Sequence, residues 1–130
     1  MTGGTEWIVD AHGCDAERLR DAAALRRLCD GVVAALALTV IGEPQVHRFG
    51  GPGGVTALYL LAESHLACHT YPESGIATFN LYCCRERAGV DWPELLREAL
   101  GAARVTVTTV TRGLGIPGVP GVPGVNGAGA

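Results

Sequence analysis

The spacing of apolar residues divides the first third of the chain into a strand and a helical region. Residues 5–12 (TEWIVDAH) alternate between polar and apolar side chains, which predicts a strand. Over residues 15–38 the apolar side chains recur at helical spacing, and we expect a helix with a break near Asp21. Its apolar stripe consists of Leu25, Leu28, Val32 and Leu36.

The middle of the chain predicts four extended segments. They are residues 39–49, 55–62, 64–70 and 76–84. Pro44 interrupts the first of them, and GGPGG at residues 50–54 is a loop. The segment SHLACHT at 64–70 continues in an extended conformation from the one before it, and a turn follows at residues 71–75.

The predicted strand at residues 76–84 places two adjacent cysteines on opposite faces. Alternation places the apolar side chains on one face, namely Ala77, Phe79, Leu81 and Cys83. The more polar face holds Ile76, Thr78, Asn80, Tyr82 and Cys84. Cys83 therefore belongs to the core, whereas Cys84 does not.

The last elements complete an α+β fold. Asp91 can cap a helix that carries Pro93 in its first turn and Glu94 in a capping box. Residues 104–111 (RVTVTTVT) are rich in β-branched side chains and predict a strand. The order β-α-β-β-β-β-α-β predicts a two-layer sandwich, a mostly antiparallel sheet with helices on one face. The other face needs cover, and we expect dimerisation through it.

Composition excludes several classes of protein. The 130 residues carry a net charge of −3, and all ten basic residues are arginines without a basic stripe, which gives no electrostatic support for a nucleic-acid partner. No apolar run reaches the roughly 20 residues of a membrane span, and the N-terminus does not resemble a signal peptide. Five cysteines, an odd number, indicate reduced thiols in the cytoplasm rather than a disulfide framework.

The C-terminal segment differs from the rest of the chain. Residues 113–130 hold 7 of the 19 glycines and 3 of the 7 prolines, with no charge or aromatic ring after Gly113. Such a segment cannot bury enough apolar area to offset the entropy lost on ordering. We expect one domain over residues 1–112 and a disordered Gly/Pro/Val tail at 113–130.

Candidate chemistry is concentrated in AESHLACHTYPE, residues 62–73, and three interpretations compete. The first is a strand pair with a solvated polar face. The second is a zinc site drawn from the permitted ligands His65, Cys68, His69, Cys84 and His12. On a strand, His65 and His69 would share one face while Cys68 points to the other, which weakens the zinc interpretation. The third is nucleophilic chemistry, although Ser64 lacks the G-x-S-x-G context of a hydrolase.

The segment LAESHLACHTYPESG closely resembles the processing-site motif of the short prokaryotic S-adenosylmethionine decarboxylases. Val46-His47-Arg48-Phe49, Gly54-Val55-Thr56-Ala57 and Gly13-Cys14-Asp15 resemble further motifs of that family. Cys84 stands fifteen residues after His69, at the spacing of the family's catalytic cysteine. The likeness covers about residues 6–113.

The resemblance implies a self-made pyruvoyl cofactor. The Ser64 hydroxyl would attack the Glu63 carbonyl, and elimination would cleave the chain into residues 1–63 and residues 64–130 capped by pyruvoyl. The pyruvoyl ketone would form a Schiff base with the substrate amine and accept electrons as CO₂ leaves. The expected reaction converts S-adenosylmethionine to its decarboxylated form, the aminopropyl donor for spermidine in polyamine biosynthesis.

The resemblance also assigns roles to individual side chains. Cys84 would be the proton donor to the decarboxylated carbon, and a thiol can serve as such a donor. His69 would promote elimination during processing, with Thr56 in support. Glu73 would hold the substrate ribose and Phe49 would stack on adenine, although Phe49 alone could equally be a core residue. The other cysteines are expected to be structural, and the family implies no metal.

The chain departs from the family pattern at several positions. Thr56 replaces the usual serine, Tyr71 a tryptophan, Asn80 an aspartate and Asp10 a glutamate, while Glu6-Trp7 replaces an N-terminal histidine and Arg85-Glu86 follows the cysteine. Such changes leave room for a pyruvoyl-dependent ornithine or arginine decarboxylase on the same scaffold. An unprocessed partner subunit is a further alternative. The favoured interpretation is a homodimer of processed units acting on a small molecule.

Overall fold

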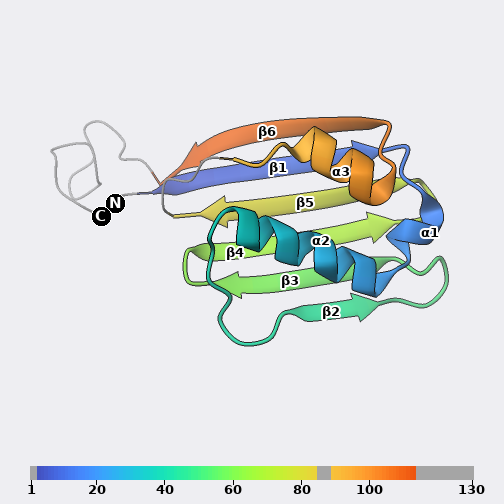
Figure 1. Ribbon diagram of the computed structural model, residues 1–130, viewed down its shortest axis with the longest axis horizontal. Helices are drawn as coiled ribbons and strands as arrows, with labels where there is room; N and C mark the ends of the chain where they lie inside the picture. Colours follow the sequence, from blue (N-terminus) through green and yellow to red (C-terminus); the bar gives the residue numbers. More distant parts are fainter. Residues whose placement is uncertain (1–2, 85–88, 114–130) are drawn as a thin grey trace, which may run out of the picture.

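One antiparallel sheet forms the body of the molecule (Figure 1). The computed structural model describes residues 3–84 and 89–113. The strands are β1 (Gly4–His12), β2 (Gln45–Arg48), β3 (Val55–Leu61), β4 (Ser64–Tyr71), β5 (Ile76–Cys83) and β6 (Arg104–Arg112). The helices are α1 (Ala16–Leu19), α2 (Ala22–Ala35) and α3 (Trp92–Leu100). The strand order is β2-β3-β4-β5-β1-β6, and every neighbouring pair is antiparallel.

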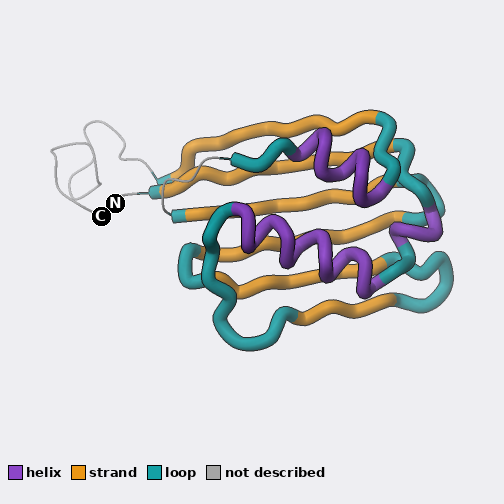
Figure 2. Tube along the Cα trace, viewed as in Figure 1, coloured by secondary structure: helices purple, strands orange, loops and turns teal. Residues whose placement is uncertain are grey.

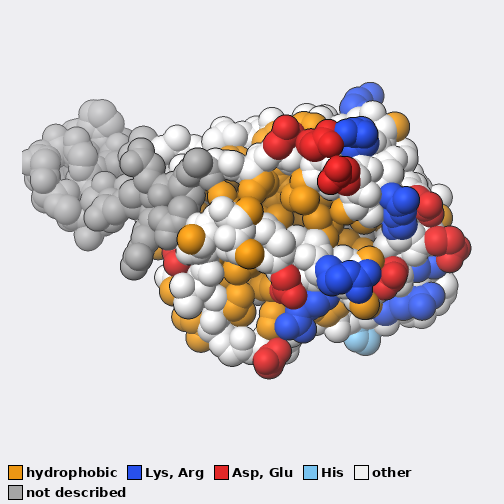
Figure 3. Space-filling view, viewed as in Figure 1, with side chains coloured by type: hydrophobic (Ala, Val, Ile, Leu, Met, Phe, Trp, Pro, Cys, Tyr) orange, Lys and Arg blue, Asp and Glu red, His pale blue; other side chains and the backbone are white. Residues whose placement is uncertain are grey.

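The two-layer arrangement predicted from the sequence is confirmed. Figure 2 shows α2 and α3 side by side in one layer, with the strands behind them. Acidic and basic side chains are interspersed over this helix side, around apolar surface between the two helices (Figure 3). Within the described residues, no helix is long and apolar enough to cross a membrane. The expected tail at 113–130 lies outside the described residues except for Gly113.

Aspartate side chains begin the helices, as the sequence indicates. Asp21 separates α1 from α2 and accepts a hydrogen bond from the Ala24 amide at 3.0 Å. Asp91 caps α3 by accepting from the Glu94 amide at 3.1 Å. The α2 helix ends at Ala35, three residues before the predicted end, because the chain turns through a left-handed Ala37 with φ of 53°.

Two strand predictions need correction. The segment 39–49 is a strand only at Gln45–Arg48, since the chain before Pro44 forms a single bridge between Val40 and Leu61. Residues 64–70 form a strand as predicted, β4, but they do not continue straight on from the segment before them. The chain reverses at Ala62 and Glu63, and β3 and β4 pair as a hairpin that closes at Leu61 and Ser64. This turn contains no glycine, asparagine or proline, so the usual turn residues do not mark it.

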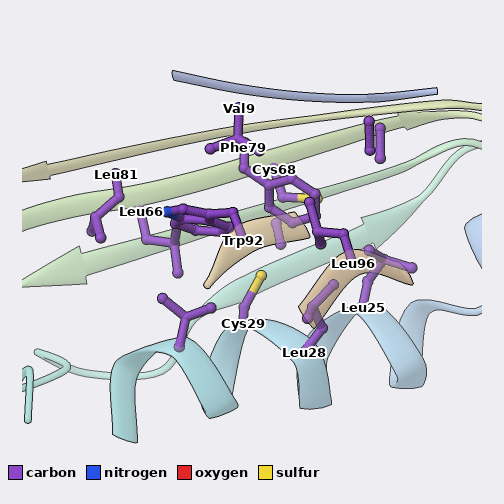
Figure 4. Packing of buried hydrophobic residues seen from close by; sticks show 14 of the residues in the cluster. Val9, Leu25, Leu28, Cys29, Leu66, Cys68, Phe79, Leu81, Trp92 and Leu96 are labelled. Carbon is purple, nitrogen blue, oxygen red and sulfur yellow. The ribbon is translucent and has the colours of Figure 1, made fainter. Parts of the chain in front are cut away.

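The core lies between the sheet and the helices (Figure 4). Apolar residues of alternate strand positions meet the inner faces of α2 and α3, and Phe79 packs against Trp92 with ring centroids 5.9 Å apart. The labelled members of this cluster are Val9, Leu25, Leu28, Cys29, Leu66, Cys68, Phe79, Leu81, Trp92 and Leu96. Cys83 is buried with them, as its alternation predicts.

Buried hydrogen bonds fix β3 and β4 against the helices. The Tyr59 hydroxyl donates to Asp30 of α2 at 2.6 Å, and burial raises the pKa of this tyrosine above its usual value. The buried Thr70 hydroxyl donates to the Leu19 carbonyl at 2.8 Å and accepts from the Val55 amide at 2.9 Å. These contacts hold rigidly the two strands that carry most of the candidate site.

The opposite face of the sheet is uncovered within the described residues. It exposes large apolar side chains from three strands, namely Ile8, Leu58, Leu60 and Tyr71. A hollow of about 290 Å³ lies at its centre, between Leu58, Ala67 and Asn80. An apolar sheet face of this kind is typical of an interaction surface.

Candidate active site

The Glu63–Ser64 bond lies at the tip of the β3–β4 hairpin. The turn is pinned from the side by Thr39, whose carbonyl accepts from the Ala62 amide at 2.8 Å. The Thr39 amide donates to Oε1 of Glu63 at 3.0 Å, and only 3% of Glu63 is exposed. Thr39 therefore holds the turn through the backbone of Ala62 and the side chain of Glu63.

Ser64 has a strained backbone and a well-defined polar environment. Its φ angle of 148° is a conformation that side-chain-bearing residues rarely adopt, at a cost of about 1–3 kcal/mol. Its Oγ lies 2.9 Å from Nδ1 of His65. The Glu63 carbonyl oxygen accepts a hydrogen bond from the Cys84 amide at 2.8 Å. We call these four residues, Glu63, Ser64, His65 and Cys84, the Ser64 cluster.

Cys84 reaches this cluster because β5 pairs with β4. Ser64 stands opposite Cys83 in the register, which puts the next residue, Cys84, beside the turn. Cys83 is buried and Cys84 is half-buried, in agreement with the predicted alternation. The backbone of Cys84 thus contacts the Glu63 carbonyl, and Cys84 is the first residue after the end of β5.

The second group of predicted residues gathers around His69. Nδ1 of His69 lies 2.5 Å from the Thr56 hydroxyl, and its ring lies 4.6 Å from Tyr71 and 6.0 Å from Phe49 between centroids. Phe49 is 46% exposed, so it is not a core residue. Glu73 is exposed in the turn that follows Tyr71. We call Phe49, Thr56, His69 and Tyr71 the His69 cluster.

The two clusters lie toward opposite ends of β4. Ser64 and His69 are five positions apart on an extended strand, which corresponds to about 17 Å at 3.3 Å per residue. A single chain therefore brings Ser64 together with Cys84 but not with His69, Thr56 or Phe49.

Two departures from the family pattern contact one another near the Ser64 cluster. The Asn80 side chain donates a hydrogen bond to the half-buried Glu6, and Arg112 forms an ion pair with the same carboxylate. These hydrogen bonds, that of Asn80 first, hold the pKa of Glu6 below its usual value. The Arg112 guanidinium also lies 5.6 Å from the centre of the Tyr82 ring. Sequence reasoning missed Arg112, because only strand pairing places it beside Glu6.

The zinc interpretation finds no matching arrangement. His65 and His69 do share the uncovered face while Cys68 is buried on the other, as the alternation predicts. Among residues 3–84 and 89–113, no three histidine, cysteine, aspartate or glutamate side chains lie close enough to hold a metal ion. All five cysteines are free.

The serine itself fits the precursor of a pyruvoyl group. Its hydroxyl contacts a basic nitrogen, its backbone is strained, and the carbonyl that it would attack is polarised by an amide donor. An amide hydrogen bond to that carbonyl is the arrangement that stabilises a developing oxyanion. This chemistry needs no external cofactor at this position.

Comparison with known proteins identifies the family. The S-adenosylmethionine decarboxylase family profile matches residues 5–113. The S-adenosylmethionine decarboxylase proenzyme of Prochlorococcus marinus is 39% identical over 100 residues, which cover 76% of this chain and 78% of that protein. The proenzyme of Caldicellulosiruptor saccharolyticus is 34% identical over 116 residues, which cover 85% and 89%. The crystal structure of the adenosylmethionine decarboxylase from Aquifex aeolicus superposes with a TM-score of 0.71 at 31% identity, over 86% of this chain and 92% of that one. The chain belongs to the S-adenosylmethionine decarboxylase family.

Proposed function

We propose that the chain is a self-processing, pyruvoyl-dependent decarboxylase that converts S-adenosylmethionine to decarboxylated S-adenosylmethionine for polyamine biosynthesis. The observation that carries the proposal is the geometry of the Glu63–Ser64 bond. A strained serine stands directly after a fixed carbonyl that accepts the Cys84 amide, with its hydroxyl on a histidine nitrogen. Family membership supports the same conclusion. Five free cysteines support a cytoplasmic location.

Processing begins at Ser64. Its Oγ bonds to the Glu63 carbonyl carbon, the peptide C–N bond breaks, and the Ser64 nitrogen takes up a proton, which leaves an ester. Loss of the Ser64 α-proton then breaks the Cβ–Oγ bond and releases residues 1–63 with a free Glu63 carboxylate. Water replaces the nitrogen of the resulting dehydroalanine, ammonia leaves, and residues 64–130 begin with a pyruvoyl group.

Once formed, the pyruvoyl group would supply a ketone that can bind the substrate amine and accept the electron pair of the carbon–carbon bond that breaks as CO₂ leaves. Cys84 supplies the proton that replaces CO₂ on the substrate carbon. Its placement beside Ser64, through the pairing of β5 with β4, supports this role. A thiol donor is a reasonable general acid for such a step.

The His69 cluster supplies the remaining roles. We propose that His69 removes the α-proton during elimination and that the Thr56 hydroxyl, 2.5 Å from its Nδ1, holds the ring in position. Phe49 is exposed beside His69 and can stack on adenine. Glu73 follows in the adjoining turn and can accept hydrogen bonds from the ribose hydroxyls.

The distance between the clusters supports a homodimer. A two-fold axis between two uncovered faces, crossing β4 near Ala67, would place the Ser64 cluster of one subunit over the His69 cluster of its partner. Ala67 lies midway between the two clusters and lines the central hollow. The exposed apolar side chains Leu58, Leu60 and Ile8 on this face would be buried by the same contact.

A release assay tests the proposed reaction. The purified protein is incubated with carboxyl-labelled S-adenosylmethionine, ornithine or arginine, and labelled CO₂ is collected. We expect release from S-adenosylmethionine and none from Ser64→Ala, which would remain one chain. Release of CO₂ from ornithine or arginine instead would show that S-adenosylmethionine is not the substrate. Normal turnover by an uncleaved Ser64→Ala protein would refute the mechanism. An uncut wild-type chain without activity would favour an unprocessed partner subunit.

A further inference from the structure

His65 is a histidine of the cleavage motif to which the proposed mechanism assigns no role. It lies on β4 directly after Ser64, and its side chain is on the uncovered face. Its Nδ1 is 2.9 Å from Ser64 Oγ, which is hydrogen-bonding distance. His65 thus contacts the Ser64 hydroxyl, whereas His69 contacts the Thr56 hydroxyl.

We propose that His65 is the general base of the first processing step, the transfer of the Glu63 acyl group from the Ser64 nitrogen to Oγ. This inference rests on the proposed function and deepens it. As Oγ bonds to the Glu63 carbonyl carbon, its proton moves to Nδ1 of His65. When the C–N bond breaks, the imidazolium returns that proton to the departing Ser64 nitrogen. The histidine is neutral before and after the step, so it acts as a true catalyst.

The surroundings of His65 suit a base that becomes charged. Its ring lies 5.8 Å from the ring of Tyr82, its partner in the β4–β5 register. The Glu6 carboxylate is kept ionised by Asn80 and Arg112, and His65 is among the groups whose charge favours that form. Glu6 stands in the same cross-strand row as His65, because both residues pair with Tyr82 in the sheet. The carbonyl oxygen already accepts the Cys84 amide, so the developing oxyanion has a donor in place.

The chain thus contains two histidines for two different proton transfers. His65 contacts the hydroxyl that must lose a proton for the ester to form. His69, held by Thr56 about 17 Å away on the same strand, belongs to the later removal of the α-proton. The two steps can be told apart, because an ester between Glu63 and Ser64 exists only after the first.

Hydroxylamine makes this distinction, since it cleaves esters under mild conditions that leave amides intact. Full-length wild type, His65→Ala, His69→Ala and His12→Ala are synthesised in a cell-free system. Each is followed by denaturing mass spectrometry with and without hydroxylamine. His12 is a matched control because it lies on the same face at the far end of β1.

We expect wild type and His12→Ala to cleave unaided. His69→Ala should stay uncut until hydroxylamine splits it, whereas His65→Ala should stay uncut and resist hydroxylamine. Loss of a general base should slow ester formation by about 10²-fold or more. Added imidazole should restore part of the cleavage of His65→Ala, which a merely structural role would not allow.

Two results would overturn the inference. One is cleavage of folded His65→Ala at the wild-type rate, and the other is an uncut His65→Ala chain that hydroxylamine splits. If circular dichroism shows that His65→Ala does not fold, the test uses His65→Gln instead. Glutamine can keep a hydrogen bond to Ser64 but cannot take its proton. Slow cleavage of His65→Gln supports the role and wild-type cleavage refutes it. A wild-type chain that is itself uncut and resistant would instead refute the proposed function.

Discussion

The two ends of β4 carry different parts of the proposed chemistry. At the Ser64 cluster the backbone is strained, the carbonyl is polarised, and a cysteine lies adjacent. At the His69 cluster the backbone is a regular strand, and the distinctive features are a histidine–threonine contact and exposed aromatic rings. The first end provides bonds to be broken, and the second provides a base and a surface for a planar ligand. If both clusters serve the proposed reaction, one chain holds two half-sites rather than one complete site.

Mixed dimers test whether the two clusters of one active site come from different subunits. Ser64→Ala and His69→Ala should each be inactive alone, because each removes one half-site from every active site. When the two variants are co-expressed, one site of each mixed dimer receives Ser64 and His69 intact from different subunits. Activity should return to about a quarter of wild type, since half of the dimers are mixed and each has one intact site.

The control for this experiment is a pair from the same cluster, Ser64→Ala with Cys84→Ala. A mixed dimer of that pair contains no site in which Ser64 and Cys84 come intact from one chain, so activity should not return. Recovery in the control pair, or none in the test pair, would contradict the division into half-sites.

Replacing Cys84 should separate processing from turnover. In the proposed mechanism the thiol protonates the substrate carbon, while the contact with the Glu63 carbonyl comes from the Cys84 backbone amide and survives substitution. Cys84→Ala should therefore cleave but decarboxylate about 10²- to 10⁴-fold more slowly. Mass spectrometry and CO₂ release give the two readings, and undiminished turnover would remove Cys84 from its role.

The Thr56 contact should have a smaller effect on processing. Thr56→Ala removes one hydrogen bond from His69, worth about 0.5–1.5 kcal/mol, and should slow cleavage by roughly 3- to 10-fold. Thr56→Ser keeps the hydroxyl and should cleave close to the wild-type rate. A time course of cleavage checks both variants, and equal rates for alanine and serine would show that the hydroxyl does not position His69.

The smallest effect is expected from removing residues 114–130. The residues of both clusters lie before position 85, and β6 ends at Arg112. Activity of the shortened chain should stay within about twofold of wild type, because no proposed role falls on the removed segment. Loss of cleavage or of folding after truncation would show that these residues support the domain.

Periodicity alone predicted much of the fold. The apolar stripe of α2, the cap at Asp91 and the alternation of β5 depend on neighbours within a few residues, and the structure confirms all three. The turn at Ala62 and Glu63 was missed because its residues are not turn formers; it is pinned by Thr39, which lies more than twenty positions earlier. The pattern of neighbouring residues cannot predict a contact between residues so far apart in the sequence.

Contacts between residues distant in sequence also determine the candidate site, and the sequence alone did not reveal them. The resemblance assigned Ser64 and His69 to one reaction without saying how they meet, and the structure separates them along an extended strand. Arg112 reaches Glu6 across 106 positions only through the pairing of β6 with β1. His65 is part of the sequence motif, but the contact between its ring nitrogen and the Ser64 hydroxyl is visible only in the structure.

The most direct test of the central claim is a denaturing intact-mass spectrum of freshly purified protein. We expect two fragments: residues 1–63, which end in a Glu63 carboxylate, and residues 64–130, which begin with a pyruvoyl group. Neither should be covalently linked to the other, since all five cysteines are free. A single intact chain of about 13.5 kDa, with decarboxylase activity present, would contradict the claim that Ser64 becomes the cofactor.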